Sequence, residues 1–417
     1  MRFYFTLPSL LVFAFGVPVV HLLVRAWFRN DAFVRKRSWY AMVRKATLFH
    51  VLGTAAAILA FINTYGWITD DVNYFFYPAD YVQPWLFSIT NANHFMWWVT
   101  YPFRRYLLVN DRPTMHVIFG LGGLLASFAY LHVYFQMLGP QANSKSKVQR
   151  SAFWALLCFP NFLAWGRFYG KDSLMLMFSA LFVVSAWHSM RYRSRFLAGT
   201  LGIVASTYLM SRIRPHIAMA FVTAYLTALV FRTVSARSKN AESPAGLLRI
   251  LIPVLAPAII FLFATASITR LTGKEDFTFE DAQRTVQESS RMGAYGGSVT
   301  DYGLAMREDT DIIFNPLQIA INVFNLLFAP LPWQVRGVAQ MIALVANIML
   351  FVFVVRYGRN VFPPRDPWGW FLLFQVFFLS IILSFLTGNM GLLMRQKLIV
   401  LPGLFLLLFM PSGKVLE

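Results

Sequence analysis

Hydrophobic residues along the chain are grouped in long runs, separated by short polar or basic stretches. The runs are about 17 to 25 residues long, and a helix of that length crosses the roughly 30 Å hydrocarbon core of a bilayer. The pattern therefore predicts an all-α fold, a polytopic transmembrane helix bundle of about eleven spans. The expected spans are residues 5–27, 47–68, 115–138, 152–166, 173–190, 196–212, 217–232, 250–269, 338–356, 369–387 and 398–411.

Composition and charge agree with an integral membrane protein. The 417 residues are 58% hydrophobic and 13% charged, and we interpret residues 1–417 as a single integral membrane domain. The net charge of +19 comes from Lys and Arg residues collected in short alternating loops, which are typical of cytoplasmic connections. The predicted topology places the N-terminus outside and the C-terminus inside. Because the basic residues form no contiguous face, nucleic acid is excluded as a partner.

Two of the predicted outer segments are long. The first, residues 69–114, is rich in Trp, Tyr and Phe, which favour the headgroup interface, so we expect short helices lying along the membrane there. The second, residues 270–337, begins polar and ends in "FNPLQIAINVFNLLFAPLPW". Its prolines and length predict an interfacial or re-entrant helix. The "GAYGG" stretch predicts a hinge, which makes this second segment a candidate lid over a site.

Charged residues gather near the predicted outer ends of several spans. A charge at the centre of a membrane helix costs about 2.5–3.5 kcal/mol on insertion scales, and less near the interface. On the predicted topology these residues all lie on the same side, which indicates a shared polar site for an anionic group. They are Asp70 and Asp71; Arg167, Lys171 and Asp172; Arg212, Arg214 and His216; and Arg395 and Lys397.

Local spacing suggests how some of these residues are presented. Arg167 and Lys171 are four residues apart, so one helical turn would present both on one face. Asp172 is expected to pair with either of them. Pro215 favours an extended conformation for Arg214 and ends the helix before it. Arginines at a helix end suit bidentate contact with a phosphate.

Structural interpretations of the same residues stay open. An arginine at the end of a span often serves as an interfacial anchor, and the charges at 167–172 would also suit an ion pair between helices. Asp70 and Asp71 would also suit a solvated loop, and His216 a packed histidine. The sequence contains no phosphate-binding loop, no dinucleotide fingerprint and no metal-ligand spacing, so it indicates no cofactor and no metal.

Several stretches resemble motifs of polytopic bacterial proteins from exopolysaccharide and O-antigen gene clusters. "FPNFLAWGRFYGKDSLML" is similar to their Pro-Ser, Phe-Trp and Lys-Asp signature, and "SRIRPHIAM" resembles the Arg-Pro-His element that follows it. "LFAPLPWQ" and "GNMGLLMRQKLIVLP" resemble two later motifs, and "TDDVNYFFYPAD" resembles the acidic start of the first outer loop. The chain departs from the patterns at Asn161, Arg167, Gln334 and Lys397. On these ordered motifs it resembles the EpsG/Wzy-type polysaccharide polymerases, membrane glycosyltransferases of the C-type superfamily.

The resemblance implies a reaction and a set of site residues. The reaction is polymerisation or transfer of polyprenyl-(pyro)phosphate-linked sugar units on the outer face of the bacterial inner membrane. Asp70 or Asp71 would act as the base toward the acceptor hydroxyl, with His216 as the substitute. Asp172 would orient Lys171. The residues assigned to the donor phosphate are Arg167, Lys171, Arg212, Arg214 and Arg395.

The implied partners are the lipid-linked glycan, membrane lipids and other polysaccharide export proteins, with no cofactor. Two other classes of function stay open. A flippase or transporter of lipid-linked glycan would place cations along a cavity that reaches both leaflets, whereas here they cluster at one. A structural subunit of an envelope glycan complex would use the same charges to contact protein partners.

Overall fold

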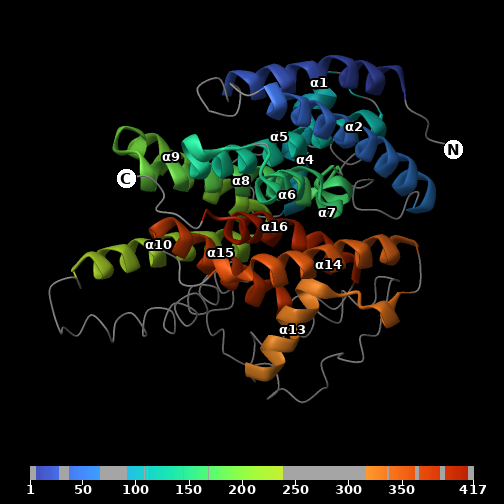
Figure 1. Cartoon of the computed structure of the whole chain (residues 1–417). Helices are drawn as coiled ribbons and strands as arrows, with labels where there is room; N and C mark the ends of the chain where they lie inside the picture. Colours follow the sequence, from blue (N-terminus) through green and yellow to red (C-terminus); the bar gives the residue numbers. More distant parts are fainter. Residues whose placement is uncertain are drawn as a thin grey trace, which may run out of the picture. The chain divides into compact units, whose positions relative to one another are not determined.

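The computed structural model describes residues 6–27, 37–65, 92–107, 109, 111–143, 145–167, 169–237, 316–335, 338–361, 366–385 and 390–411. Within these ranges all regular secondary structure is helical, which confirms the predicted all-α class (Figure 1). Six helical segments there are long and apolar enough to cross a membrane, as expected of a multi-pass membrane protein. They are Leu7–Ala26, Arg112–Leu138, Lys171–Arg191, Arg193–Ile213, Gln340–Asn360 and Pro367–Ser384. The predicted number of about eleven spans stays a prediction. The expected span 250–269 lies outside the described ranges.

The described helices belong to two compact units, residues 1–214 with 413–417 and residues 215–412. The expectation of one integral membrane domain stays a prediction. The helices of the first unit are α1 (Leu7–Trp27), α2 (Arg37–Tyr65), α4 (Ala92–Arg105), α5 (Arg112–Leu138), α6 (Lys147–Cys158), α7 (Pro160–Ala164), α8 (Lys171–Arg191) and α9 (Phe196–Ile213). The helices of the second unit are α10 (Pro215–Arg237), α13 (Pro316–Phe328), α14 (Val338–Tyr357), α15 (Pro367–Phe385) and α16 (Met390–Leu408).

In the first unit, α5 and α8 form the interior. In the most apolar stretches of α5 and α8, 78% and 72% of the residues are buried. The corresponding shares for α1 and α9 are 17% and 28%. Helices that are apolar all round are typical of buried positions. The Tyr130 hydroxyl of α5 donates to Ser179 Oγ of α8 at 2.8 Å, so a buried polar pair also joins the two helices. Asp111 caps the start of α5 by accepting from Thr114 N at 2.8 Å.

The neighbouring helices α8 and α9 pack closely because small residues line their contact. A Cβ atom on Gly199 of α9 would lie 2.7 Å from Ser185 O and 2.8 Å from Ser189 N of α8. A Cβ atom on Gly202 would lie 2.2 Å from Ser185 Oγ. In lipid, where the hydrophobic effect between helices is absent, such backbone proximity supplies the van der Waals contact that holds two helices together.

We expect Gly199→Ala to lower the free energy of unfolding by about 1–3 kcal/mol, since the added methyl group meets backbone atoms that cannot rotate away. The midpoint of thermal unfolding in detergent measures the effect. Gly358→Ala is the matched control, because nothing lies within 4 Å of the position its Cβ would take. Equal midpoints for the two variants would show that the close approach of α8 and α9 is absent.

The expected single span over residues 152–166 is wrong. Helix α6 ends at Cys158, Phe159 is extended, and α7 begins again at Pro160 before a short 3-10 helix, η4 (Trp165–Arg167). Proline lacks the N–H of a continuing helix and disfavours the helical conformation of the residue before it. The broken segment approaches α5 so closely that a Cβ on Gly123 would lie 1.8 Å from Gly166 O, so only glycine fits there.

In the second unit, α15 contacts α10, α13 and α16. Three of its five described helices begin with proline, Pro215, Pro316 and Pro367. Proline suits the first helical position because its missing N–H would be unpaired there in any case. Helix α13 lies in the segment predicted to hold an interfacial or re-entrant helix, and its helical conformation is confirmed. The "GAYGG" hinge and the lid lie outside the described ranges.

Candidate functional site

The candidate site in the first unit begins where η4 gives way to α8. Gly170 is extended, with φ 175° and ψ −179°, and α8 starts at Lys171. Arg167 is the last residue of η4, so Arg167 and Lys171 do not share a helical turn as the spacing predicted. The side chain of Arg167 lies outside the described part of the chain. Lys171 and Asp172 are therefore the first two residues of α8, directly after the extended Gly170.

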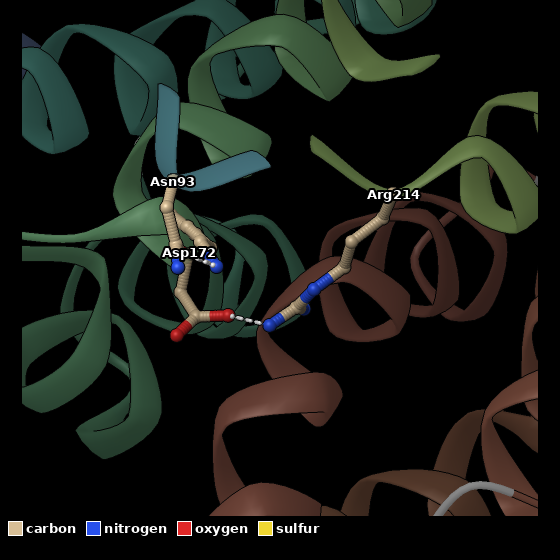
Figure 2. Close-up of polar contacts among 4 residues, drawn as sticks. Asn93, Asp172 and Arg214 are labelled. Atoms are coloured by element: carbon tan, nitrogen blue, oxygen red, sulfur yellow. Dashed lines mark hydrogen bonds and ion pairs between the residues drawn. The ribbon is translucent and has the colours of Figure 1, made fainter. Parts of the chain in front are cut away.

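Asp172 forms an ion pair with Arg214. Arg214 Nη2 lies 2.7 Å from Asp172 Oδ1, and the two side chains are 14% and 4% exposed. Figure 2 shows the guanidinium group directed at the carboxylate. Arg214 immediately follows α9 with φ −146°, and α10 begins at Pro215, so the predicted helix end at this proline is confirmed. The pair therefore joins the start of α8 to the end of α9.

Lys171 contacts the segment of residues 69–114, the first predicted outer segment. Its ammonium group donates to Asn93 Oδ1 of α4 at 2.7 Å. Asp172 pairs with Arg214 and Asn93 contacts the lysine, while the expectation that Asp172 orients Lys171 stays a prediction. The role of Asn93 could not be predicted, because one amide in an aromatic segment carries no pattern. Helix α4 lies in the outer segment where short helices were expected, and residues 66–91 lie outside the described ranges.

A buried tyrosine supports the turn before Lys171. Tyr169 is fully buried, its N–H donates to His116 Nδ1 at 3.0 Å, and its hydroxyl lies 2.9 Å from Thr100 Oγ1. Thr100 belongs to α4 and His116 to α5, so the turn is fixed against both helices. Neither contact was predicted. These contacts fix the position of the turn that leads into Lys171 and Asp172.

The site carries more positive than negative charge. Lys171 and Arg214 contribute two positive charges and Asp172 one negative charge, so the formal sum is +1. Arg212 lies in the last turn of α9, and its guanidinium is 4.6 Å from the centroid of the Tyr208 ring. Arg214 Nη1 is buried and has no hydrogen-bond partner among the described residues. A buried guanidinium nitrogen with N–H groups to spare suits an oxygen of an anionic ligand.

Four other predicted site residues lie in the second unit or outside the described ranges. Asp70 and Asp71 lie outside the described ranges. His216 is the second residue of α10 and Arg395 lies in α16, both in the second unit, and both are half-buried. Their assignment to one site with Lys171 and Arg214 stays a prediction.

The second unit holds a buried lysine of its own. Lys397 of α16 is 1% exposed, and its ammonium group donates to Ala329 O at 2.6 Å and to Asn347 Oδ1 at 2.9 Å. Asn347 Nδ2 in turn donates to Phe328 O at 2.9 Å. These bonds tie α16 and α14 to the end of α13. Lys397 is therefore bound by neutral oxygens inside the second unit, and these contacts have a structural role.

The described ranges contain no group of three or more His, Cys, Asp or Glu side chains placed to hold a metal ion. Comparison of the chain with known protein families, with curated proteins and with solved structures finds no match. The described part of the protein has several helices of membrane-span length. At the start of α8, Lys171 and Asp172 contact Asn93 and Arg214.

Proposed function

We propose that the protein is a membrane glycosyltransferase that polymerises or transfers sugar units carried on a polyprenyl (pyro)phosphate. It would act on the outer face of the bacterial inner membrane, in the synthesis of an exopolysaccharide or O-antigen-type glycan. The observation that carries the proposal is the cluster of Lys171, Asp172 and Arg214, held together at two helix ends. The sequence motifs around these same residues resemble those of EpsG/Wzy-type polymerases.

The chemistry asks for fixed cations more than for a strong acid. The leaving group is a lipid phosphate, so the developing negative charge is what must be stabilised. Lys171 and Arg214 would bind its oxygens, and Asp172 would hold the Arg214 guanidinium in position. Prearranged donors in a site shielded from water act without reorganisation, which makes them effective in the transition state.

The acceptor side of the reaction rests on the sequence alone. Asp70 or Asp71, with His216 as the substitute, would accept the proton of the attacking hydroxyl, and Arg395 would add a further contact to the phosphate. Positioning of the acceptor over the anomeric carbon would supply much of the rate enhancement.

The direct test is a turnover assay with purified protein in lipid nanodiscs. The substrate is a polyprenyl-diphosphate-linked oligosaccharide, and products are sized on a gel. We expect Lys171→Gln to reduce the rate about a hundredfold, the usual cost of removing one charge-stabilising donor. Lys171→Arg keeps the charge and should retain more activity. Lys145→Gln, at an exposed lysine between α5 and α6, is the control and should turn over at the wild-type rate.

The same preparation separates the other classes of function. Wild-type turnover by Lys171→Gln would refute the assignment of the phosphate site. Movement of the lipid-linked glycan across vesicle membranes without elongation would identify a flippase, and failure to bind the lipid-linked glycan at all would favour a structural subunit. Arg395→Gln, assayed in parallel, tests the predicted phosphate contact that lies in the second unit.

A further inference from the structure

The connection between α8 and α9 concentrates positive charge at one end of two membrane-length helices. Arg191, Arg193 and Arg195 lie within five residues, and the chain has no Asp or Glu between Asp172 and Glu242. A short 3-10 helix, η5 (Arg193–Arg195), makes the turn. Both flanking helices are long and apolar enough to span a membrane, so a connection this short lies at headgroup depth.

Aromatic and polar neighbours restrain two of these arginines, Arg191 and Arg195. The Arg195 guanidinium lies 5.3 Å from the centroid of the Tyr192 ring, and its Nη1 lies 3.3 Å from His188 Nε2. The Tyr192 hydroxyl donates to Gln136 Oε1 of α5 at 2.7 Å, which anchors the ring. The Arg191 guanidinium lies 6.0 Å from the centroid of the Trp187 ring. Restrained side chains lose less conformational entropy when they bind a ligand.

Among the described residues, the loop between α8 and α9 has no counter-ions of its own. None of the three arginines has a carboxylate partner among the described residues, and Arg193 and Arg195 are exposed. Arginine stays charged at every physiological pH, so the positive charge of the loop is permanent. Planar guanidinium groups bind phosphate oxygens with two parallel hydrogen bonds. The loop is therefore suited to a phosphate group at the membrane surface.

An exposed apolar strip on α9 begins directly after the arginines. Leu197, Leu201 and Val204 are 71%, 61% and 61% exposed. Their spacing of four and three residues places them on one face of the helix. From Leu197 to Val204 the strip is about 10 Å long, which covers most of one leaflet of a bilayer with a core of about 30 Å. A ligand bound here would have an anionic head and an apolar tail.

We propose that η5 and the exposed face of α9 form a binding site for an anionic phospholipid. Its phosphate contacts Arg193 and Arg195, Arg191 adds charge at the rim, and an acyl chain lies along Leu197, Leu201 and Val204. The apolar strip distinguishes a lipid from free phosphate, which has no tail to bury. This inference does not depend on the proposed transferase activity, because it uses none of the residues of that site.

Native mass spectrometry of the delipidated protein in detergent, titrated with phosphatidylglycerol or phosphatidylcholine, tests the proposal. We expect the wild type to bind phosphatidylglycerol at least tenfold more tightly. Arg193→Gln with Arg195→Gln should weaken that binding about thirtyfold, following the usual contribution of each basic residue near an anionic surface. Arg356→Gln with Arg359→Gln is the matched control, since it removes two exposed arginines from the end of α14 and η9 (Gly358–Asn360).

Two further arms make the result decisive. Arg193→Lys with Arg195→Lys keeps the charge and should retain most of the preference for phosphatidylglycerol, which guards against misfolding of the Gln variant. Leu197→Ser with Leu201→Ser should weaken binding of the lipid but not its charge preference. Equal loss in the 193/195 and 356/359 variants would overturn the site. Competition by soluble glycerophosphate at the same concentration as the lipid would show that the tail is not bound, and would overturn the proposal as well.

Discussion

Replacing Asn347 by leucine is expected to lower the free energy of unfolding of the protein by about 3 kcal/mol, because it takes a hydrogen-bond acceptor from a buried ammonium group. Lys397 is 1% exposed and is bound by Asn347 Oδ1 and Ala329 O. The variant also removes the bond from Asn347 Nδ2 to Phe328 O. Unfolding in mixed detergent and SDS micelles, followed by circular dichroism, measures the loss.

A second substitution separates loss of the contact from loss of shape. Lys397→Met in the Asn347→Leu background removes the buried amino group that was left without its acceptor, so most of the lost stability should return. Asn360→Leu is the matched control, because Asn360 Nδ2 donates to the neutral Leu408 O at 2.9 Å and should cost only about 1 kcal/mol. If the double variant is no more stable than Asn347→Leu, the Lys397 amino group is not bound by Asn347 as described.

Replacing Asp172 by leucine is expected to have a comparable effect in the first unit. Arg214 is then left with its guanidinium largely buried and without its carboxylate. Breaking one partner of a buried ion pair costs about 3 kcal/mol or more, whereas replacing both partners by apolar side chains is often close to neutral. Thermal unfolding should therefore show a large loss for Asp172→Leu and recovery in Asp172→Leu with Arg214→Met.

The double variant also distinguishes structure from function. If Arg214 binds the donor phosphate, Asp172→Leu with Arg214→Met folds at near wild-type stability but elongates no lipid-linked glycan. Full turnover by this stable double variant would leave the ion pair as a purely structural contact between α8 and α9. If the double variant is unstable, the cost of Asp172→Leu does not come from leaving Arg214 buried without its carboxylate. The phosphate site is then tested by the activity of the Lys171 variants.

The positions of helices and of some helix ends could be predicted, because they depend on interactions between residues close together in the sequence. Apolar length set the positions of α1, α5, α8, α9, α14 and α15 to within a few residues, since a run of that length has to bury its backbone in helical hydrogen bonds. Pro215 ended α9 because a proline restricts the residue before it. The same rule applies at Pro160, which interrupts the apolar run of residues 152–166. These effects act within a few residues and can be read from sequence.

The partners of the charged residues could not be predicted in this way. Lys171 and Asp172 are adjacent, yet one contacts Asn93 from α4 and the other Arg214 beyond α9. Lys397 meets an asparagine 50 residues away. Each choice depends on how helices pack, which small residues such as Gly123 and Gly199 permit and which no local pattern specifies. The sequence by itself determined an all-helical membrane protein with charged helix ends, and only the tertiary structure decided which charges meet, because contact between distant segments follows from helix packing.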